Sequence, residues 1–218
     1  MSVNLKLDWC SHAAAKYAVM HWHYSETMPV GKLAKIGVWE DNKFIGCIIF
    51  GRGANKSLLK PYGLNQDGGC ELVRIALDKH VSTVTKIMSI AIKMLKKQFT
   101  KLELIVSFAD SNQKHLGIIY QAGNWIYTGK TSEEYSYFYN NKWMHRRSAG
   151  SARGTIVGLE KKDNGHRKRY LYPLSKDIRD KVVKLSKPYP KNCPAGVNGN
   201  TPSFQGGDRG SNPTVGLK

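Results

Sequence analysis

The stretch CELVRIALDKHVSTVTKIMSIAIKMLKKQFTKLELIVSF, residues 70–108, decides the fold of this chain. Its beginning, residues 70–77, predicts a strand, and the apolar residues that follow at helical spacing predict a helix from about residue 83 to residue 99. The nearly unbroken apolar run over 102–108 predicts a buried strand. Because a crossover helix separates the two strands, we expect them to be parallel.

The residues on the N-terminal side predict a helix and a hairpin. The Ala-rich segment 12–21 predicts a helix whose first turn is capped by Ser11. Residues 35–51 contain two runs of β-branched and aromatic residues around Asp41-Asn42-Lys43, which predicts a β-hairpin. Between them lies an aromatic loop, 21–29, that ends at Pro29. Loops of this composition often carry functional residues.

The residues on the C-terminal side complete an α+β pattern. We expect the buried strand to stop at Asp110-Ser111-Asn112, which caps a short helix that reaches Ala122 and holds His115. Two further strands are predicted at 125–128 and 135–139. The predicted elements follow the order of the acetyltransferase-like (GNAT) fold: a helix, a hairpin, a β-α-β unit, a short helix and two strands. We therefore expect a mixed central sheet flanked by helices.

Positive charge is concentrated behind this predicted core. The chain carries 34 Lys and Arg against 16 Asp and Glu, a formal net charge of +18. Residues 1–141 hold 17 basic and 11 acidic residues, whereas residues 142–191 hold 15 and 4. This concentration indicates a polyanionic partner, because neutralised phosphates release condensed counterions. A surface kept soluble by lysines is the alternative interpretation.

The charge distribution therefore predicts a catalytic domain over 1–141 and a basic extension over 142–187 that binds double-stranded DNA. The expected phosphate contacts are Arg146, Arg147, Arg167, Lys168 and Arg169. One short amphipathic helix is predicted over 175–185. Residues 188–218, rich in Gly and Pro, are expected to form a flexible tail, because they bury too little apolar surface to offset chain entropy.

Several classes of protein are disfavoured. No apolar stretch approaches the roughly 20 residues that span a bilayer, and no signal peptide is recognisable, so we expect no membrane contact and a location in the bacterial cytoplasm. The four cysteines are widely spaced and form no CxxC pair. They are expected to be reduced thiols rather than disulfides or zinc ligands.

Three ordered motifs resemble the Mom family of phage DNA modification proteins. They are His23-Tyr24-Ser25 before Met28-Pro29, Glu71-Leu-Val-Arg-Ile75, and residues 107–129 with an Asp, GxxYQA and NWxYxG. Together they span about residues 20–140. The resemblance implies a GNAT-like fold and conversion of adenine in DNA to N6-carbamoylmethyladenine, which protects phage DNA from host restriction. It also implies an acetyl-CoA-like small-molecule donor and iron.

Four residues are the candidates for catalysis: His23, Tyr24, Asp110 and Tyr120. Asp110 ends a buried strand, where a carboxylate can accept the adenine amine proton or bind a metal; capping the next helix is its alternative role. His23 can act as a base or a ligand, and Tyr24 can stack on the purine. Tyr120 matches the family tyrosine and can protonate a departing thiolate, unless it is a core residue.

Arg74 and Ser89 are the candidates for holding the donor. Arg74 is predicted on the face of its strand opposite Val73 and Ile75, where a buried arginine must be paired or face an anionic ligand. Ser89 matches a small polar position of the family near the cofactor. One feature departs from ordinary GNAT enzymes: residues 78–86 contain no glycine. The turn that holds a pyrophosphate through backbone amides is therefore missing, and conventional coenzyme A binding is in doubt.

The chemistry of the expected product also disfavours simple acyl transfer. Attack on a thioester carbonyl bonds nitrogen to the carbonyl carbon, whereas carbamoylmethylation bonds nitrogen to a CH2 group. A different donor or a metal would account for the product. His23, Asp110 and His115 form a histidine and carboxylate set that suits non-haem iron.

Two other functions fit parts of the sequence. One is an ordinary N-acetyltransferase acting on a protein or a small amine, which the missing glycine turn disfavours. The other is a non-enzymatic DNA-binding anti-restriction protein, which leaves the polar residues His23, Asp110 and Tyr120 without a role.

Overall fold

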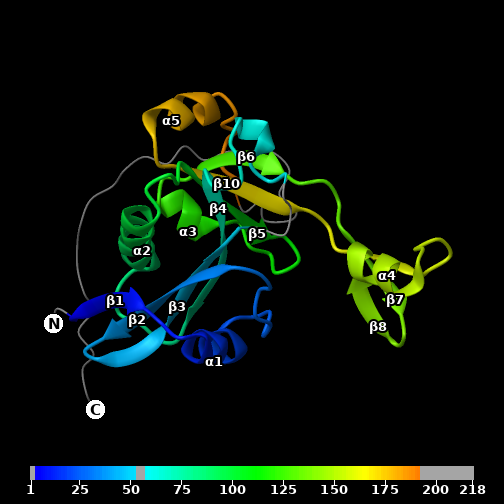
Figure 1. Cartoon of the computed structure of the whole chain (residues 1–218), viewed down its shortest axis with the longest axis horizontal. Coiled ribbons are helices and arrows are strands. Elements are labelled where there is room, and N and C mark those ends of the chain that lie inside the picture. Colours follow the sequence, from blue (N-terminus) through cyan, green and yellow to red (C-terminus); the bar gives the residue numbers. More distant parts are fainter. Residues whose placement is uncertain (1–2, 53–56, 192–218) are drawn as a thin grey trace, which may run out of the picture.

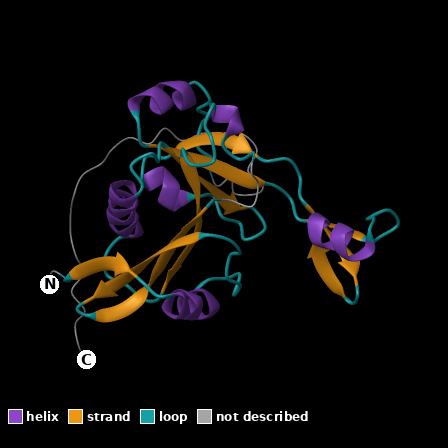
Figure 2. Cartoon of the chain, in the orientation of Figure 1, coloured by secondary structure: helices purple, strands orange, loops and turns teal. Residues whose placement is uncertain are grey.

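The computed structural model describes residues 3–52 and 57–191, except for the side chains of His145 and Arg147. These residues form a large mixed sheet flanked by helices, and a small lobe that projects from one side (Figures 1 and 2). The large sheet has the strand order β1-β2-β3-β4-β5-β10-β6. Its strands are β1 (Leu5–Trp9), β2 (Leu33–Glu40), β3 (Lys43–Gly51), β4 (Gly69–Leu77), β5 (Leu104–Asp110), β6 (Ile126–Lys130) and β10 (Arg167–Pro173).

The predicted α+β class, with its elements in the acetyltransferase-like order, is confirmed. Strands β4 and β5 are parallel, as expected from the helix between them. Strands β2 and β3 form the predicted hairpin, whose turn residues Asp41 and Asn42 have φ of 47° and 65°. Left-handed values at both positions match the twist of the two strands. The helices are α1 (His12–Trp22), α2 (Val84–Gln98), α3 (Ile118–Ala122), α4 (Arg146–Arg153) and α5 (Lys176–Val183), with a 3-10 turn η1 at Lys60–Tyr62.

Helices cover both faces of the large sheet. On one face α2 packs its apolar stripe, including Ile87, Ala91 and Leu95, against the inward residues of β3 to β5. On the opposite face Ala15, Ala18 and Val19 of α1 pack on β3 and β4, and α5 packs on β5 and β10. Ser11, Thr83 and Ser175 cap α1, α2 and α5, each accepting a backbone N–H in the first turn. The expected Ser11 cap is therefore confirmed.

Strand β10 contradicts the expected domain boundary after residue 141. It pairs with β5 over Arg167↔Asp110 to Pro173↔Leu104, and with β6 on its other side. Residues 167–183 thus complete the sheet and its helical cover, so the basic segment does not form a separate extension. This strand is not evident in the sequence, because its charged first half, RKR, precedes the buried Tyr170 and Leu171 and resembles a surface segment.

The small lobe is the part of the basic segment that lies outside the large sheet. Strand β7 (Tyr135–Tyr139), which was expected in the core, pairs instead with β8 (Lys142–His145) and β9 (Lys161–Asp163) in a separate sheet. Helix α4 follows β8 directly. Two chain segments connect the lobe to the core, and backbone hydrogen bonds join them side by side. The N–H of Thr131 donates to the carbonyl of Arg167, and the N–H of Glu134 donates to the carbonyl of Gly165.

Three other expectations need comment. The predicted helix that would hold His115 begins only at Ile118, after Gly117 in the left-handed region, so His115 lies in the loop before it. None of the helices among the described residues has the length and apolar character needed to cross a bilayer. Cys10, Cys47 and Cys70 are free thiols, while Cys193 and residues 192–218 of the expected tail lie outside the described residues.

Candidate active site

A gap opens where β4 and β5 stop pairing. Their parallel ladder runs from Gly69↔Leu104 to Leu72↔Ser107 and ends there, although both strands continue. A cavity of about 400 Å³ lies beyond this point. Its lining includes six of the predicted site residues, namely His23, Tyr24, Arg74, Asp110, His115 and Tyr120.

The floor of the gap is a chain of two hydrogen bonds. The Ser107 hydroxyl lies 2.9 Å from the Leu72 carbonyl and 2.8 Å from the Tyr120 hydroxyl. A carbonyl only accepts, so the Ser107 proton goes to Leu72 and the Tyr120 hydroxyl donates to Ser107. Tyr120 is fully enclosed, and burial raises its pKa to about 12. Its proton is held at the junction of the two strands.

Asp110 lies at the rim of the gap, at the last position of β5. One carboxylate oxygen accepts the Asn112 backbone N–H at 2.9 Å, which closes a turn and does not cap the following helix. Lys168 of β10 holds the same loop, because its ammonium donates to the Ser111 hydroxyl at 3.0 Å and to the His115 carbonyl at 3.1 Å. The carboxylate therefore has a fixed direction and one oxygen free of backbone contact.

His23 is held as a neutral imidazole in the lining of the same cavity. Its Nδ1 accepts the Ser25 backbone N–H at 3.1 Å, with the Ser25 hydroxyl at 2.8 Å. A nitrogen that accepts a backbone N–H carries no proton, so in the neutral ring the proton is on Nε2. Burial, and then the charges of Arg74 and His115, lower the pKa of His23 to about 4. The ring is uncharged at neutral pH.

Tyr24 is the exposed aromatic ring at the mouth of the cavity. It is 51% exposed and meets His115 edge to face, with ring centroids 5.5 Å apart. Partial burial and the nearby Asp110 carboxylate raise the pKa of Tyr24. The neighbouring Trp22 packs instead with Phe44 on the sheet. An exposed ring beside a carboxylate is suited to stack on a planar ligand.

Arg74 brings an unpaired positive charge into the cavity. The pairing of β4 with β3 is irregular next to Ile49. Arg74 pairs with Ile49, which packs against α1, so Arg74 lies on the α1 face of the sheet. Ile75 lies on the opposite face, which α2 covers, as predicted. Among the described residues Arg74 forms no ion pair, and its Nε is buried without a hydrogen-bond partner. Its Nη1 donates a hydrogen bond to the carbonyl of Val73 at 2.9 Å. This guanidinium is available to an anionic ligand.

The predicted metal ligands do not form a ligand set. His23, Asp110 and His115 line one cavity, but the described residues contain no group of three or more His, Cys, Asp or Glu side chains arranged to hold a metal ion. Nδ1 of His23 is also engaged by Ser25. The residues present therefore do not fit the expected iron site.

A buried carboxylate of the protein itself closes the loop before α2. The backbone N–H groups of Val81 and Ser82 donate to the two carboxylate oxygens of Glu40, at 2.9 and 2.7 Å. Glu40 is almost fully buried. Burial alone would raise the pKa of Glu40, but the two backbone hydrogen bonds, a side-chain hydrogen bond from Ser82 and the charge of His80 together lower that pKa. Val81 and Ser82 precede the N-cap Thr83, so these two amides are not free to bind a phosphate, and the bonds to Glu40 lie outside the first turn of α2.

Other predicted residues lie away from the cavity or are buried. Ser89 lies on the exposed side of α2 and does not line the cavity. Lys168 was expected to contact DNA, but it is 8% exposed and bonded to the Ser111 and His115 loop, so it is not free to bind a phosphate. Arg169 is half-buried over the ring of Phe108.

Two of the predicted DNA contacts are exposed. Arg146 lies at the start of α4, and Arg167 forms a 2.9 Å ion pair with Glu134 at the base of the lobe. The side chain of Arg147 lies outside the described residues.

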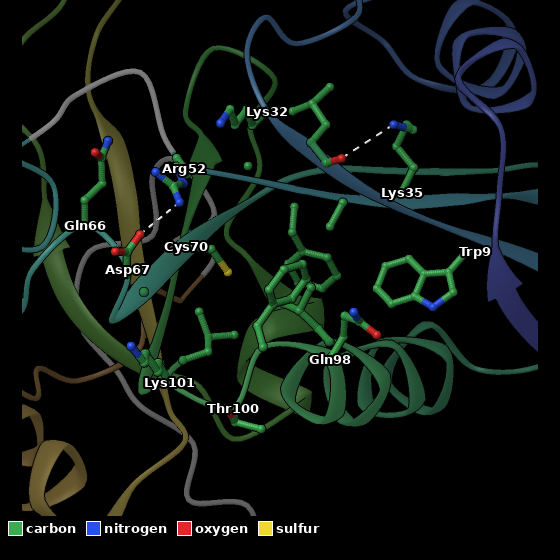
Figure 3. A pocket seen from close by; sticks show the side chains of 18 of the residues that line it. Trp9, Lys32, Lys35, Arg52, Gln66, Asp67, Cys70, Gln98, Thr100 and Lys101 are labelled. Carbon is green, nitrogen blue, oxygen red and sulfur yellow. Dashed lines mark hydrogen bonds and ion pairs between the residues drawn. The ribbon is translucent and has the colours of Figure 1, made fainter.

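A larger cavity, of about 850 Å³, lies at the other end of β4 (Figure 3). It is lined by the start of β4, the end of α2 and the edge of β2, with Trp9 and Cys70 among its residues. Figure 3 shows Arg52 paired with Asp67, at 2.8 Å. Burial raises the pKa of the Cys70 thiol to about 12, so this cysteine is not a ready nucleophile. None of the predicted site residues lines this cavity.

Two residues that shape this region, Glu40 and Ser107, are not predicted from the sequence, and Lys168 is predicted there in a different role, as a DNA contact. Glu40 ends a hairpin strand and Lys168 belongs to a basic run, so each has an ordinary surface interpretation in the sequence. Ser107 interrupts the apolar run of β5, and a lone polar residue in a buried strand is the one signal that pointed to an internal hydrogen bond.

Most of the chain is similar to one known protein family. The Mom protein family model matches residues 4–191. Methylcarbamoylase mom of Escherichia phage Mu is 26% identical over 206 residues, covering 87% of this chain and 85% of that protein.

Solved acetyltransferases are more distant. An N-acyl amino acid synthase from uncultured soil microbes has 10% identity and a TM-score of 0.48, covering 84% of this chain and 98% of that one. A Bacillus subtilis acetyltransferase in complex with CoA has 11% identity and a TM-score of 0.46, covering 80% and 100%. Likenesses at this level carry no conclusion about ligand or reaction.

Proposed function

This chain belongs to the Mom protein family, and from that premise we propose that it is a transferase that converts adenine in double-stranded DNA to N6-carbamoylmethyladenine. The observation that carries the proposal is the meeting of His23, Tyr24 and Asp110 around one cavity where β4 and β5 separate. In the proposed role the enzyme protects phage DNA from restriction in the cytoplasm of a bacterial host.

The proposal requires the target adenine to leave the base stack. The N6 amine is hidden in a duplex, so the base must rotate outward, at a cost of a few kcal/mol. The half-exposed ring of Tyr24 at the cavity mouth provides a surface on which the flipped purine can stack. The cavity, of about 400 Å³, is of a size that suits a base with a small reacting group.

Asp110 is the proposed general base. The lone pair of N6 is delocalised into the purine ring, so bond formation to carbon must be accompanied by loss of an N–H proton. The Asp110 carboxylate, oriented by Asn112, accepts that proton as N6 bonds to the CH2 carbon of the donor. In the same step the bond from that carbon to the donor's leaving group breaks, and the leaving group departs with the electron pair. The neutral His23 accepts no proton until the pH approaches about 4, and its Nε2–H can instead donate a hydrogen bond to the base or the donor.

The donor, of the acetyl-CoA-like class that the family resemblance implies, is proposed to place its reacting group within the cavity. The amides of Val81 and Ser82, just before α2, are already bonded to Glu40 and are not proposed to hold it. Arg74, whose Nε is buried without a hydrogen-bond partner, is proposed to hold an anionic part of the donor. Tyr120 is proposed to position rather than to protonate, because its hydroxyl proton is directed to Ser107.

Mass spectrometry of nucleosides tests the proposal directly. DNA from cells that express the chain should contain N6-carbamoylmethyladenine, and DNA from cells with Asp110→Asn should not. Unmodified DNA from wild-type-expressing cells, or acetylated amines without modified DNA, would refute the proposal. Acetylated amines would favour an ordinary N-acetyltransferase. Unmodified DNA alone would favour an anti-restriction protein that acts by binding.

A further inference from the structure

The small lobe presents two large aromatic rings to solvent. Phe138 of β7 and Trp143 of β8 are directly opposite each other in the ladder, with ring centroids 5.3 Å apart. They are 37% and 42% exposed. A lobe of this size would gain stability by burying such rings, so their exposure indicates a partner.

A lysine lies on the same face as this aromatic pair. Residues paired across a ladder share a face, and so do alternate residues of a strand. Ser136 pairs with Lys162 and lies two residues before Phe138, so Lys162 shares the face of Phe138 and Trp143. We call this set, Ser136, Phe138, Trp143 and Lys162, the aromatic face. Over residues 135–163 the sequence has six Lys and Arg against two Asp and Glu.

The lobe is anchored beside the candidate active site. Its second tether enters β10 at Arg167, which is opposite Asp110 in the β5 ladder. The side-chain amide of Asn112 donates to the Asn164 carbonyl at 2.7 Å, which joins the loop after Asp110 to the base of the lobe. Figure 1 shows the lobe projecting from this edge of the large sheet. A polymer that places one unit in the cavity would therefore pass the lobe.

We propose that the aromatic face is a second contact with duplex DNA, in which Phe138 and Trp143 pack on the bases or sugars beside the flipped adenine and Lys162 binds a flanking phosphate. The inference rests on the proposed function and adds an apolar contact to an interaction otherwise ascribed to charge. Aromatic or apolar wedges stabilise unstacked steps in DNA, which is the state that base flipping requires. A second copy of this chain is disfavoured as the partner, because each copy carries a net charge of +18.

The test compares three variants of the full chain on a short fluorescently labelled duplex, by anisotropy between about 50 and 200 mM salt. We expect Trp143→Ala and Phe138→Ala each to weaken binding about tenfold at every salt concentration, because loss of a base contact removes no charge. Trp9→Ala is the matched control, since Trp9 is also 42% exposed but lies on β1 by the other cavity. Its affinity should equal that of the wild type.

A second pair of variants keeps the test informative if the alanine variants unfold. Trp143→Leu preserves apolar packing against Phe138 but lacks a broad ring, and should also bind more weakly, with an unchanged melting temperature. Lys162→Ala should reduce the slope of log affinity against log salt by about 0.9. Equal binding by Trp143→Leu and Trp9→Ala would overturn the inference, as would a shift from dimer to monomer in light scattering with unchanged DNA affinity. If the wild type modifies DNA but the Phe138 and Trp143 variants bind the duplex as tightly as Trp9→Ala, the inference fails while the proposed function stands.

Discussion

The carboxylate of Glu40 lies 2.7 Å from the backbone nitrogen of Ser82, and its other oxygen accepts the N–H of Val81. This contact joins the end of β2 to the loop residues before the N-cap of α2. It gives hydrogen-bond partners to two backbone amides of that loop, which would otherwise have to be satisfied by water or a ligand.

Glu40→Gln should lower the free energy of unfolding by about 2 kcal/mol at pH 7, because charge-assisted hydrogen bonds become neutral ones. The folded-state pKa of Glu40 is lowered, so its contribution is present above the unfolded value of 4.5 and is lost as pH falls through the folded value. Urea unfolding from pH 7 to pH 3 should therefore show the two proteins converging in acid. A constant difference across this range would contradict the prediction; Glu160→Gln on the exposed lobe is the control.

Asp110→Asn should abolish adenine modification while it leaves duplex affinity and melting temperature near those of the wild type. Asn can still accept the Asn112 N–H, so the turn is preserved, but it cannot accept a proton in the reaction. The loss should be at least about a hundredfold, the lower range of general base effects. Retention of full activity would reduce Asp110 to a turn residue.

His23 should remain neutral in the folded protein down to about pH 4, as followed by NMR of its ring protons with His23→Gln identifying the signal. Since the folded pKa lies below the unfolded 6.5, its contribution to stability is complete above pH 6.5 and is lost as pH falls from 6.5 to 4. The wild type should thus lose more stability over this range than His23→Gln. A His23 titration near 6.5 would show that the ring is solvated and free of Ser25.

Lys168→Met should reduce modification without changing the salt dependence of DNA binding. The ammonium holds the Ser111 hydroxyl and the His115 carbonyl, and its loss should cost about 1–3 kcal/mol of stability and loosen the loop that carries Asp110. Arg146→Ala, which removes an exposed charge on α4, should instead lower the salt slope by about 0.9. A similar drop in slope for Lys168→Met would show that this lysine reaches phosphate after all.

Gly117→Ala should destabilise the protein by about 2 kcal/mol, as measured by chemical unfolding. Gly117 has φ of 77°, and a Cβ there would fall against the ring of Tyr170. Gly63→Ala separates the two causes, because Gly63 has φ of 72° but no atom within 4 Å of an added Cβ. It should cost about 1 kcal/mol. Equal losses in both variants would mean that the contact with Tyr170 contributes nothing.

The sequence by itself determined the elements whose information is local. Period and capping residues were sufficient for α1 and α2, and the separation of two apolar runs by a helix was sufficient for the parallel pairing of β4 and β5. The motifs around Tyr24 and Asp110 also marked the residues that line one cavity. These features depend on neighbours in the chain, so a linear pattern contains them.

Only the tertiary structure decided which distant segments complete the sheet and the site. Strand β10 enters between β5 and β6 from far along the chain, and this places Lys168 under the Asp110 loop where the sequence suggested a DNA contact. Glu40 likewise meets amides some forty residues away. The role of a charged side chain depends on what burial brings to it, and burial is a property of the assembled sheet that no local pattern encodes.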